Sequence, residues 1–195
     1  MRRAASLPSF RQRTVAAELE RSLEAASNER YRVVHYSLQA DHIHLVVEAV
    51  DRIALSRGTQ GLAIRLARAF NRVVGRRGKV WADRFHERDL RSPREVRAVI
   101  VYVLMNHKKH RGTKWAPLTR ARSERRLDAF SSAAWFDGFD ARADSDVVAL
   151  RDGLPMAALP VVRPRTWLLR KGWRRGGLIG PDESPVSAHG AGTRR

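Results

Sequence analysis

Cysteine is missing from this chain of 195 residues, and apolar runs are short. Without a thiol the chain can form no disulfide, no thiolate zinc site and no cysteine nucleophile, so any metal must bind histidine, carboxylate or amide ligands. No apolar run reaches the roughly 18 residues of a membrane span, and no apolar signal core is found. We therefore expect a cytoplasmic protein with no membrane partner.

Acidic residues are also scarce. Asp and Glu total 20 against 38 Lys and Arg, which gives a formal net charge of +18. Such an excess of positive charge indicates a polyanionic partner, and nucleic acid is the simplest one. Hydrophobic residues make up 43% of the chain, which is enough for a folded core, so the composition argues against a disordered basic protein.

Alternating hydrophobic residues predict an antiparallel hairpin. Its strands are expected at residues 31–38 and 42–50, joined by a short link. In the first strand Val34, Tyr36 and Leu38 are expected on one side. A further strand is expected over residues 80–90.

Helical periodicity predicts three helices. The first covers the N-terminal stretch to about residue 28, the second runs from about Gln60 to Arg76, and the third runs from Pro93 to about His110. Ser92-Pro93-Arg94-Glu95 forms a capping box at the start of the third helix. Composition then divides the chain into a main domain at 1–119, a partly helical connector at 120–150, and a basic tail with Trp and Pro at 151–195 whose end is expected to be disordered.

Two histidines stand at alternate positions of the second expected strand. Because side chains alternate across a strand, His42 and His44 point to one face, opposite the apolar Ile43, Leu45 and Val47. Neutral imidazoles are common metal ligands, and alternate positions converge without backbone strain. The pair is therefore a candidate metal site, although two ordinary surface or core histidines give the same pattern.

A tyrosine lies on the flank of the third expected helix. Val96, Ile100 and Val103 mark the core-facing stripe of this helix, and Tyr102 lies roughly 120° around from it. Asn106 follows one turn later on the side of Tyr102. The phenol is a candidate nucleophile and the amide oxygen a candidate third metal ligand, while a tyrosine packed at the edge of the core is the alternative.

A row of cations follows the second expected helix. Basic residues recur there at spacings of three and four and continue beyond it, which predicts phosphate contacts from Arg65, Arg68, Arg72, Arg76, Arg77 and Lys79. An ordinary solvated helix face is the alternative. In the tail, Trp167 and Trp173 lie among arginines, where they can either stack on unpaired bases or dock the tail onto the main domain.

Together these motifs resemble the HUH single-tyrosine transposases, in particular the REP-associated tyrosine transposase group. The similarity covers about residues 8 to 112, and its motifs occur in the family's order. VHYSLQADHIHLVVE is similar to the family's histidine hairpin, GKVWADRFHERDL to the strand before its tyrosine helix, and YVLMNHKKHRG to the tyrosine helix itself. The resemblance implies an α+β fold with a ferredoxin-like antiparallel sheet and helices on one face, followed by an irregular basic C-terminal extension. The strand that usually comes first in the family is not found before Leu7, and Asn106-His107 stands where the family commonly has Asn-Pro.

The resemblance also implies roles for individual residues. His42 and His44 match the metal-binding pair, Tyr102 the nucleophile, and Asn106 the polar residue that completes the metal site. The implied activity is that of a DNA transposase, which cleaves and rejoins single-stranded or hairpin DNA through a covalent phosphotyrosine with Mg²⁺ or Mn²⁺. In the family the tyrosine stays on the 5′ phosphate, a free 3′ hydroxyl is left, and a homodimer can share active sites.

Two other functions remain open at this point. Some metallohydrolases also start from a His-x-His motif, but their further ligands usually follow closely, whereas apolar residues follow here, and the chain is short for a barrel of about 250 residues. The other alternative is a nucleic-acid-binding protein without catalysis, such as a decayed or domesticated transposase, which the missing first strand favours.

Overall fold

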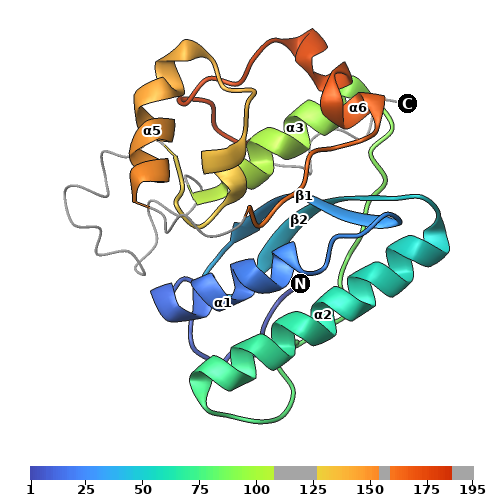
Figure 1. Ribbon diagram of the computed structural model, residues 1–195, viewed down its shortest axis with the longest axis vertical. Helices are drawn as coiled ribbons and strands as arrows, with labels where there is room; N and C mark the ends of the chain where they lie inside the picture. Colours follow the sequence, from blue (N-terminus) through green and yellow to red (C-terminus); the bar gives the residue numbers. More distant parts are fainter. Residues whose placement is uncertain (108–126, 154–158, 186–195) are drawn as a thin grey trace, which may run out of the picture.

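The computed structural model covers residues 1–195 and describes residues 1–107, 127–153 and 159–185 (Figure 1). An antiparallel hairpin of β1 (Tyr31–Leu38) and β2 (Ile43–Ala49) lies at its centre. The helices around it are α1 (Arg13–Glu24), α2 (Arg52–Val74), α3 (Pro93–Leu104), α5 (Asp144–Asp152) and α6 (Trp167–Arg170), with short 3-10 helices η2 (Ser132–Trp135), η3 (Ala141–Ala143) and η4 (Gly172–Gly176). The expected α+β class is confirmed. Within these described ranges, no helix has both the length and the apolarity to cross a membrane.

A β-bulge in β1 changes which side chains face each side of the sheet. The pairing with β2 shifts between Val33 and His35. As a result Val34 packs with α3, whereas Tyr36 and Leu38 belong to the cluster under α1 and α2. The prediction that Val34 shares a face with Tyr36 and Leu38 is therefore wrong, since an extra residue in a strand reverses the alternation beyond it.

Residues 1–4 extend the sheet by a short stretch of pairing. The Ile43 amide donates to the Met1 carbonyl at 2.8 Å, and the Met1 ammonium donates to the Ile43 carbonyl at 3.0 Å. On the other side, the Ala4 amide donates to the Val80 carbonyl at 2.9 Å. The N-terminal residues thus lie between the start of β2 and the segment that contains Val80, paired through isolated bridges rather than as a full strand.

The strand expected over residues 80–90 does not form. Trp81 makes an isolated bridge with Arg3, but no ladder follows it. Val80 is buried, whereas most of residues 83–89 are charged and exposed. A stretch of exposed charged side chains has no apolar face to bury against a neighbouring strand, so it remains extended without joining the sheet.

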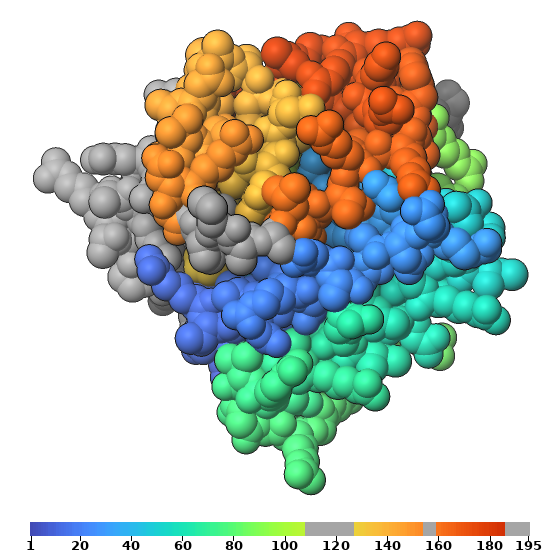
Figure 2. Space-filling view, in the orientation of Figure 1, coloured from blue at the N-terminus to red at the C-terminus, as the bar shows by residue number. Residues whose placement is uncertain are grey.

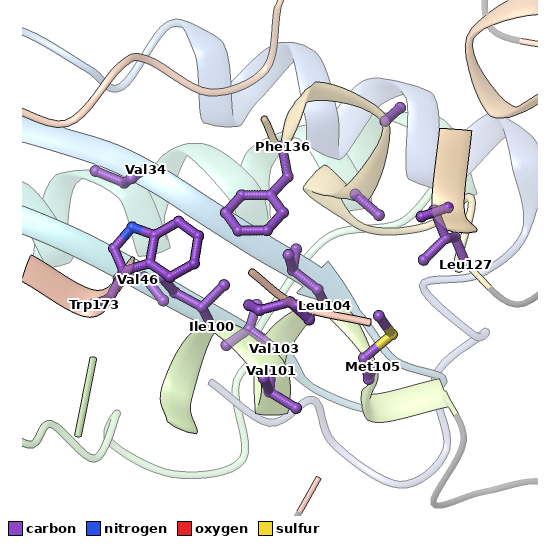
Figure 3. Packing of buried hydrophobic residues seen from close by; sticks show 14 of the residues in the cluster. Val34, Val46, Ile100, Val101, Val103, Leu104, Met105, Leu127, Phe136 and Trp173 are labelled. Atoms are coloured by element: carbon purple, nitrogen blue, oxygen red, sulfur yellow. The ribbon is translucent and has the colours of Figure 1, made fainter. Parts of the chain in front are cut away.

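Helices cover both faces of the sheet, rather than the one face expected (Figure 1). On one face, α1 and α2 enclose a cluster that includes Leu19 and Leu66. On the other, α3 and the C-terminal segments enclose a second cluster. Figure 3 shows part of it, with Phe136 and Trp173 near Ile100 of α3. A sheet that carries apolar side chains on both faces has to be covered on both.

Helix boundaries differ from the expected ones where capping groups decide them. α2 begins at Arg52 instead of near Gln60, because the Asp51 carboxylate accepts the Ala54 amide at 2.6 Å. α2 ends at Val74 and is capped by Gly75, whose φ of 67° suits a residue without a side chain.

The other two expected helices are shorter than predicted. α1 ends at Glu24 instead of about residue 28. α3 has the predicted capping box of Ser92 and Glu95 but ends at Leu104, and its expected end at His110 lies outside the described residues.

The C-terminal extension packs against the main part of the chain (Figure 2). Trp173 is 2% exposed, its indole donates to the Leu169 carbonyl at 3.1 Å, and its ring lies 5.3 Å from that of Phe136. Docking, rather than stacking on bases, is therefore the role of Trp173. Trp167 is 49% exposed, and the Arg175 guanidinium lies over its ring, 4.8 Å from the ring centroid. The expected disorder at the chain end falls on residues 186–195, outside the described residues.

Candidate active site

The two histidines of the hairpin lie side by side, as predicted from their spacing. His44 is in β2 and His42 immediately precedes it, so both rings project from the face that α3 covers. Their Nε2 atoms are 2.8 Å apart and their rings are nearly perpendicular at 85°. Two imidazole nitrogens that converge in this way either share a proton or present lone pairs to one cation.

Asp41 orients the first of these rings. Its Oδ1 lies 2.7 Å from Nδ1 of His42, and its Oδ2 lies 3.5 Å from Nε of Arg2. Burial opposes ionisation of Asp41, but the hydrogen bond and charge of His42 and the charge of Arg2 hold its pKa below the ordinary value. A carboxylate that accepts Nδ1–H leaves the Nε2 lone pair of His42 directed at His44, which is the arrangement that supports a metal-binding histidine.

Tyr102 meets the histidine pair from α3. Val96, Ile100 and Val103 of that helix are buried, which places Tyr102 on the flank of the buried stripe. Its ring packs edge-on against His44 with 5.0 Å between ring centroids and an interplanar angle of 84°. Residues more than fifty positions apart along the chain are thus in contact.

Tyr102 differs from the other tyrosines of the chain in its exposure. The chain has three tyrosines, and Tyr31 and Tyr36 are 1% and 0% exposed. Tyr102 is half-buried and lines a groove at the surface. It is therefore the tyrosine that an external phosphate can reach.

Asn106 follows two residues after the end of α3. It is 1% exposed, and its Nδ2 has no hydrogen-bond partner among the described residues. A buried amide nitrogen without a partner costs free energy, so the Asn106 amide is a candidate for contact with a bound ligand. His42, His44, Tyr102 and Asn106 all line one groove.

The groove runs along β2 between α3 and the extended segment 83–91. Its lining charges are balanced, in contrast to the net charge of +18 for the whole chain. The lining arginines are Arg2, Arg52, Arg84, Arg88, Arg91 and Arg94, and the lining carboxylates are Glu48, Asp51, Asp83, Glu87, Asp89 and Glu95. The excess positive charge therefore lies elsewhere in the chain.

The predicted cation row is not part of this groove. Arg65, Arg68 and Arg72 are exposed in the second half of α2, whereas the groove is lined by the first turns of that helix. Arg72 lies 3.4 Å from Glu18 of α1, and Arg76 donates to Asn71 at 2.7 Å. Arg77 and Lys79 are exposed beyond the helix end. The row forms a separate basic surface.

Sequence reasoning missed two groups at this site. Asp41 supports His42, and its position directly before the His-x-His motif was the available signal. Arg94 lines the groove and precedes Tyr102 by two steps of four residues, a spacing that places both on one helix face. Among the described residues no group of three or more His, Cys, Asp or Glu side chains is placed to hold a metal. The candidate ligands expected from the sequence are two imidazoles and one amide.

Comparison with known proteins adds no relative to these observations. No family model, no curated protein and no solved structure matches the chain. A function for this chain therefore has to be inferred from its own residues.

Proposed function

We propose that this protein is a metal-dependent tyrosine transposase that cleaves and rejoins single-stranded or hairpin DNA. The observation that carries the proposal is the contact of His42, His44 and Tyr102 in a groove that Asn106 also lines. The Nε2 atoms of His42 and His44 are 2.8 Å apart, the ring of Tyr102 packs on His44, and Asn106 lines the same groove. Such a set combines metal ligands with an accessible nucleophile.

The donor set fits a divalent ion. His42 and His44 offer nitrogen ligands, and a half-turn of the Asn106 amide brings its oxygen to the position of the Nδ2 that has no partner among the described residues. Imidazole and amide ligands suit Mn²⁺, and Mg²⁺ is the alternative that phosphoryl chemistry favours. A divalent ion bound there supplies Lewis-acid polarisation of a phosphate oxygen.

The reaction is a transesterification that balances without a nucleotide cofactor. The Tyr102 oxygen forms a bond to phosphorus as its proton leaves, and the bond from phosphorus to the 3′ oxygen of the neighbouring nucleotide breaks. The 3′ oxygen takes up a proton, so a 5′ phosphotyrosine and a free 3′ hydroxyl result. Attack by a 3′ hydroxyl on the phosphotyrosine reverses the step and restores Tyr102, which accounts for rejoining.

The short N-terminal pairing supports a ferredoxin-like arrangement for the domain. Residues 1–4 lie between the start of β2 and the segment around Trp81, and β1 flanks β2 on its other side. The order across these paired segments is the segment around Trp81, residues 1–4, β2 and β1. In this arrangement His42 and His44 lie close to its centre.

Binding to DNA is supported by the charge and by the basic surface on α2. A row of exposed arginines that includes Arg65, Arg68 and Arg72 can follow a phosphate backbone. We expect affinity to fall steeply as salt rises, with each neutralised phosphate contributing roughly one unit to the slope of log affinity against log salt. A nucleic-acid-binding protein without catalysis is the second candidate, because this surface lies apart from the groove and does not depend on it.

The deciding experiment is formation of a covalent adduct. Labelled single-stranded and hairpin oligonucleotides are incubated with the protein and Mn²⁺, and the adduct is resolved on denaturing gels and mapped by mass spectrometry. We expect a DNA-linked peptide that contains Tyr102. Tyr102→Phe should abolish the adduct, and His42→Ala or His44→Ala should reduce it by at least about a hundredfold. Chelation of the metal should have the same effect.

Tyr36→Phe is the matched control for loss of a phenol. Tyr36 is buried and donates to Glu20, so this change tests whether a modest loss of stability alone prevents the reaction. Equal adduct in wild type and Tyr102→Phe would show that the nucleophile is misassigned. Tight DNA binding without any adduct on a hairpin panel would favour the binding protein.

A further inference from the structure

The arginines that line the groove fall into two groups. Four of them lie beside a described carboxylate, at 3.5 Å for Arg2 and Asp41, 4.0 Å for Arg52 and Glu87, 3.0 Å for Arg88 and Glu95, and 3.4 Å for Arg91 and Asp89. The side chains of Arg84 and Arg94 form no ion pair and no hydrogen bond with any described residue. Charge that is not neutralised by the protein itself is available for a phosphate.

Arg94 shares a helix face with the nucleophile. Residues 94, 98 and 102 of α3 are four apart, so their side chains lie in one row, and all three line the groove. Arg94 and Ala98 are exposed, and the small Ala98 leaves space between Arg94 and Tyr102. The rise of about 1.5 Å per residue separates the two ends of this row by about 12 Å along the helix axis.

We propose that Arg94 binds a DNA phosphate about two to four nucleotides from the scissile phosphate. This number follows from the separation of about 12 Å along the helix, because a stacked strand rises about 3.4 Å per nucleotide and a stretched strand rises more. This inference rests on the proposed function, because Tyr102 marks the scissile phosphate. The bound strand then runs along α3 from Tyr102 toward the start of that helix. Four of the other groove arginines are neutralised by carboxylates, and of the two that are not, Arg94 is the one on the helix that carries Tyr102.

The contact is confined to one side of the cleavage position. Since Arg94 lies on one side of Tyr102 only, it engages nucleotides on one side of the cleavage position and not on the other. A contact of this kind positions the scissile phosphate against the nucleophile without reading base identity. Arg94 is therefore a substrate-positioning residue, and sequence preference has to come from other groups.

The test uses oligonucleotides in which one phosphate at a time is replaced by an uncharged methylphosphonate. Binding is measured by fluorescence anisotropy with Mn²⁺ in a Tyr102→Phe background, so that no cleavage interferes. We expect one position on one side of the scissile phosphate at which replacement weakens binding about tenfold or more, as for one charge-assisted hydrogen bond. Arg94→Ala should weaken binding of the unmodified strand to a similar extent and should abolish the effect of replacement at that position.

Two further variants serve as controls. Arg94→Lys keeps the charge and should restore part of the position effect. Arg13→Ala removes an exposed arginine from α1, on the opposite face of the sheet, and should leave the position profile unchanged. Thermal melts check that each variant is folded.

The outcomes separate this inference from the proposed function. If Arg94→Ala keeps the wild-type position profile, or if no position shows the effect, the assignment of Arg94 is overturned while adduct formation by Tyr102 can still hold. If the profile depends on Arg94 but the wild type forms no adduct, the strand contact is supported and catalysis is not. Failure to bind any strand contradicts both.

Discussion

Asp41 and His42 are joined by a hydrogen bond of 2.7 Å between Oδ1 and Nδ1, while Nε2 of the same imidazole lies 2.8 Å from His44. The carboxylate therefore supports the ring from the side away from the candidate metal position. Partners of this kind fix the tautomer of a metal-binding histidine and raise its basicity.

We predict that Asp41→Ala weakens Mn²⁺ binding by about tenfold or more, the range observed for loss of such partners. The affinity is measured by calorimetry or by electron paramagnetic resonance of free Mn²⁺ during a titration. Asp83→Ala, which removes an exposed carboxylate from the same groove, controls for the change in net charge. Equal losses in the two variants would mean that Asp41 acts only through its charge.

An ion pair between the N-terminal loop and the segment after residue 126 should be important for stability. Arg11 donates to both carboxylate oxygens of Asp128 at 2.7 and 2.8 Å, and the Asp128 side chain is 3% exposed. Burial alone would raise the pKa of Asp128, but the charge and hydrogen bonds of Arg11 hold it below the ordinary value. We predict that Asp128→Asn lowers the free energy of unfolding by about 3 kcal/mol, because it leaves a partly buried charge uncompensated.

The matched comparison for this ion pair is Arg174 with Asp137. Their charged groups lie 3.0 Å apart, but the Asp137 side chain is 88% exposed. Asp137→Asn should therefore change the free energy of unfolding by less than about 1 kcal/mol. Urea denaturation of both variants measures the difference, and similar values would contradict the importance of burial.

Glu48 connects β2 to the C-terminal extension. Its carboxylate accepts the backbone amides of Arg165 and Thr166 at 2.7 and 2.8 Å and the Thr166 hydroxyl at 2.6 Å. We predict that Glu48→Ala loosens the segment that carries α6 and increases its cleavage by trypsin about tenfold or more, since proteolysis follows the population of the open state. The tryptophan emission of the chain, to which Trp173 contributes, should shift to longer wavelength as its buried ring meets water.

The control for Glu48 is Glu29, which contacts the same segment from the surface. Glu29 lies 2.8 Å from Arg165 and its side chain is 84% exposed. Glu29→Ala should leave both the proteolysis rate and the fluorescence nearly unchanged. If Glu48→Ala behaves in the same way, packing of Trp173 alone holds the extension.

Glu20 should make the protein less stable as pH rises toward neutrality. Burial raises the pKa of Glu20 to about 7, although the hydrogen bond from Tyr36 acts in the opposite direction. The folded state therefore binds a proton that the unfolded state has lost above about pH 4.5. The stabilising contribution is complete below pH 4.5 and is lost as pH rises through 7, with a slope of at most about 1.4 kcal/mol per pH unit.

Glu20→Gln tests this assignment. The amide can still accept from Tyr36 but cannot ionise. As the pH is raised from ~5 to ~8, the free energy of unfolding of the variant should therefore increase relative to that of the wild type. Urea denaturation at the two pH values measures the change. Asp152→Asn removes an exposed carboxylate and should show the same pH dependence as wild type, and an identical result for Glu20→Gln would exclude Glu20 as the cause.

Local patterns predicted much of the hairpin and of the candidate site. Alternation along β2 placed His42 and His44 on one face, and the spacing in α3 placed Tyr102 beside the buried stripe with Asn106 beyond it. The capping box at Ser92 marked the start of α3 correctly. These features depend on neighbouring residues only, and strand and helix periodicities are visible in the sequence.

Other features depend on contacts between distant residues and could not be predicted in this way. The bulge at Val34 reversed a face assignment, and Asp51 moved the start of α2 by more than one turn. The basic row of α2 could be seen in the sequence, but its separation from the groove could not. The burial of Trp173 also depended on partners far along the chain, among them Phe136.

The sequence by itself determined the chemistry that is available: no thiols, a large positive charge, a pair of imidazoles on one strand face and a tyrosine on a helix flank. Only the tertiary structure decided that Tyr102 packs against His44, that Asp41 supports His42, and that Arg94 is the groove arginine aligned with Tyr102 that has no described carboxylate partner. The reason is that side-chain type and local periodicity are properties of short segments. Proximity between segments arises when both faces of the sheet are buried at once, which no single segment specifies.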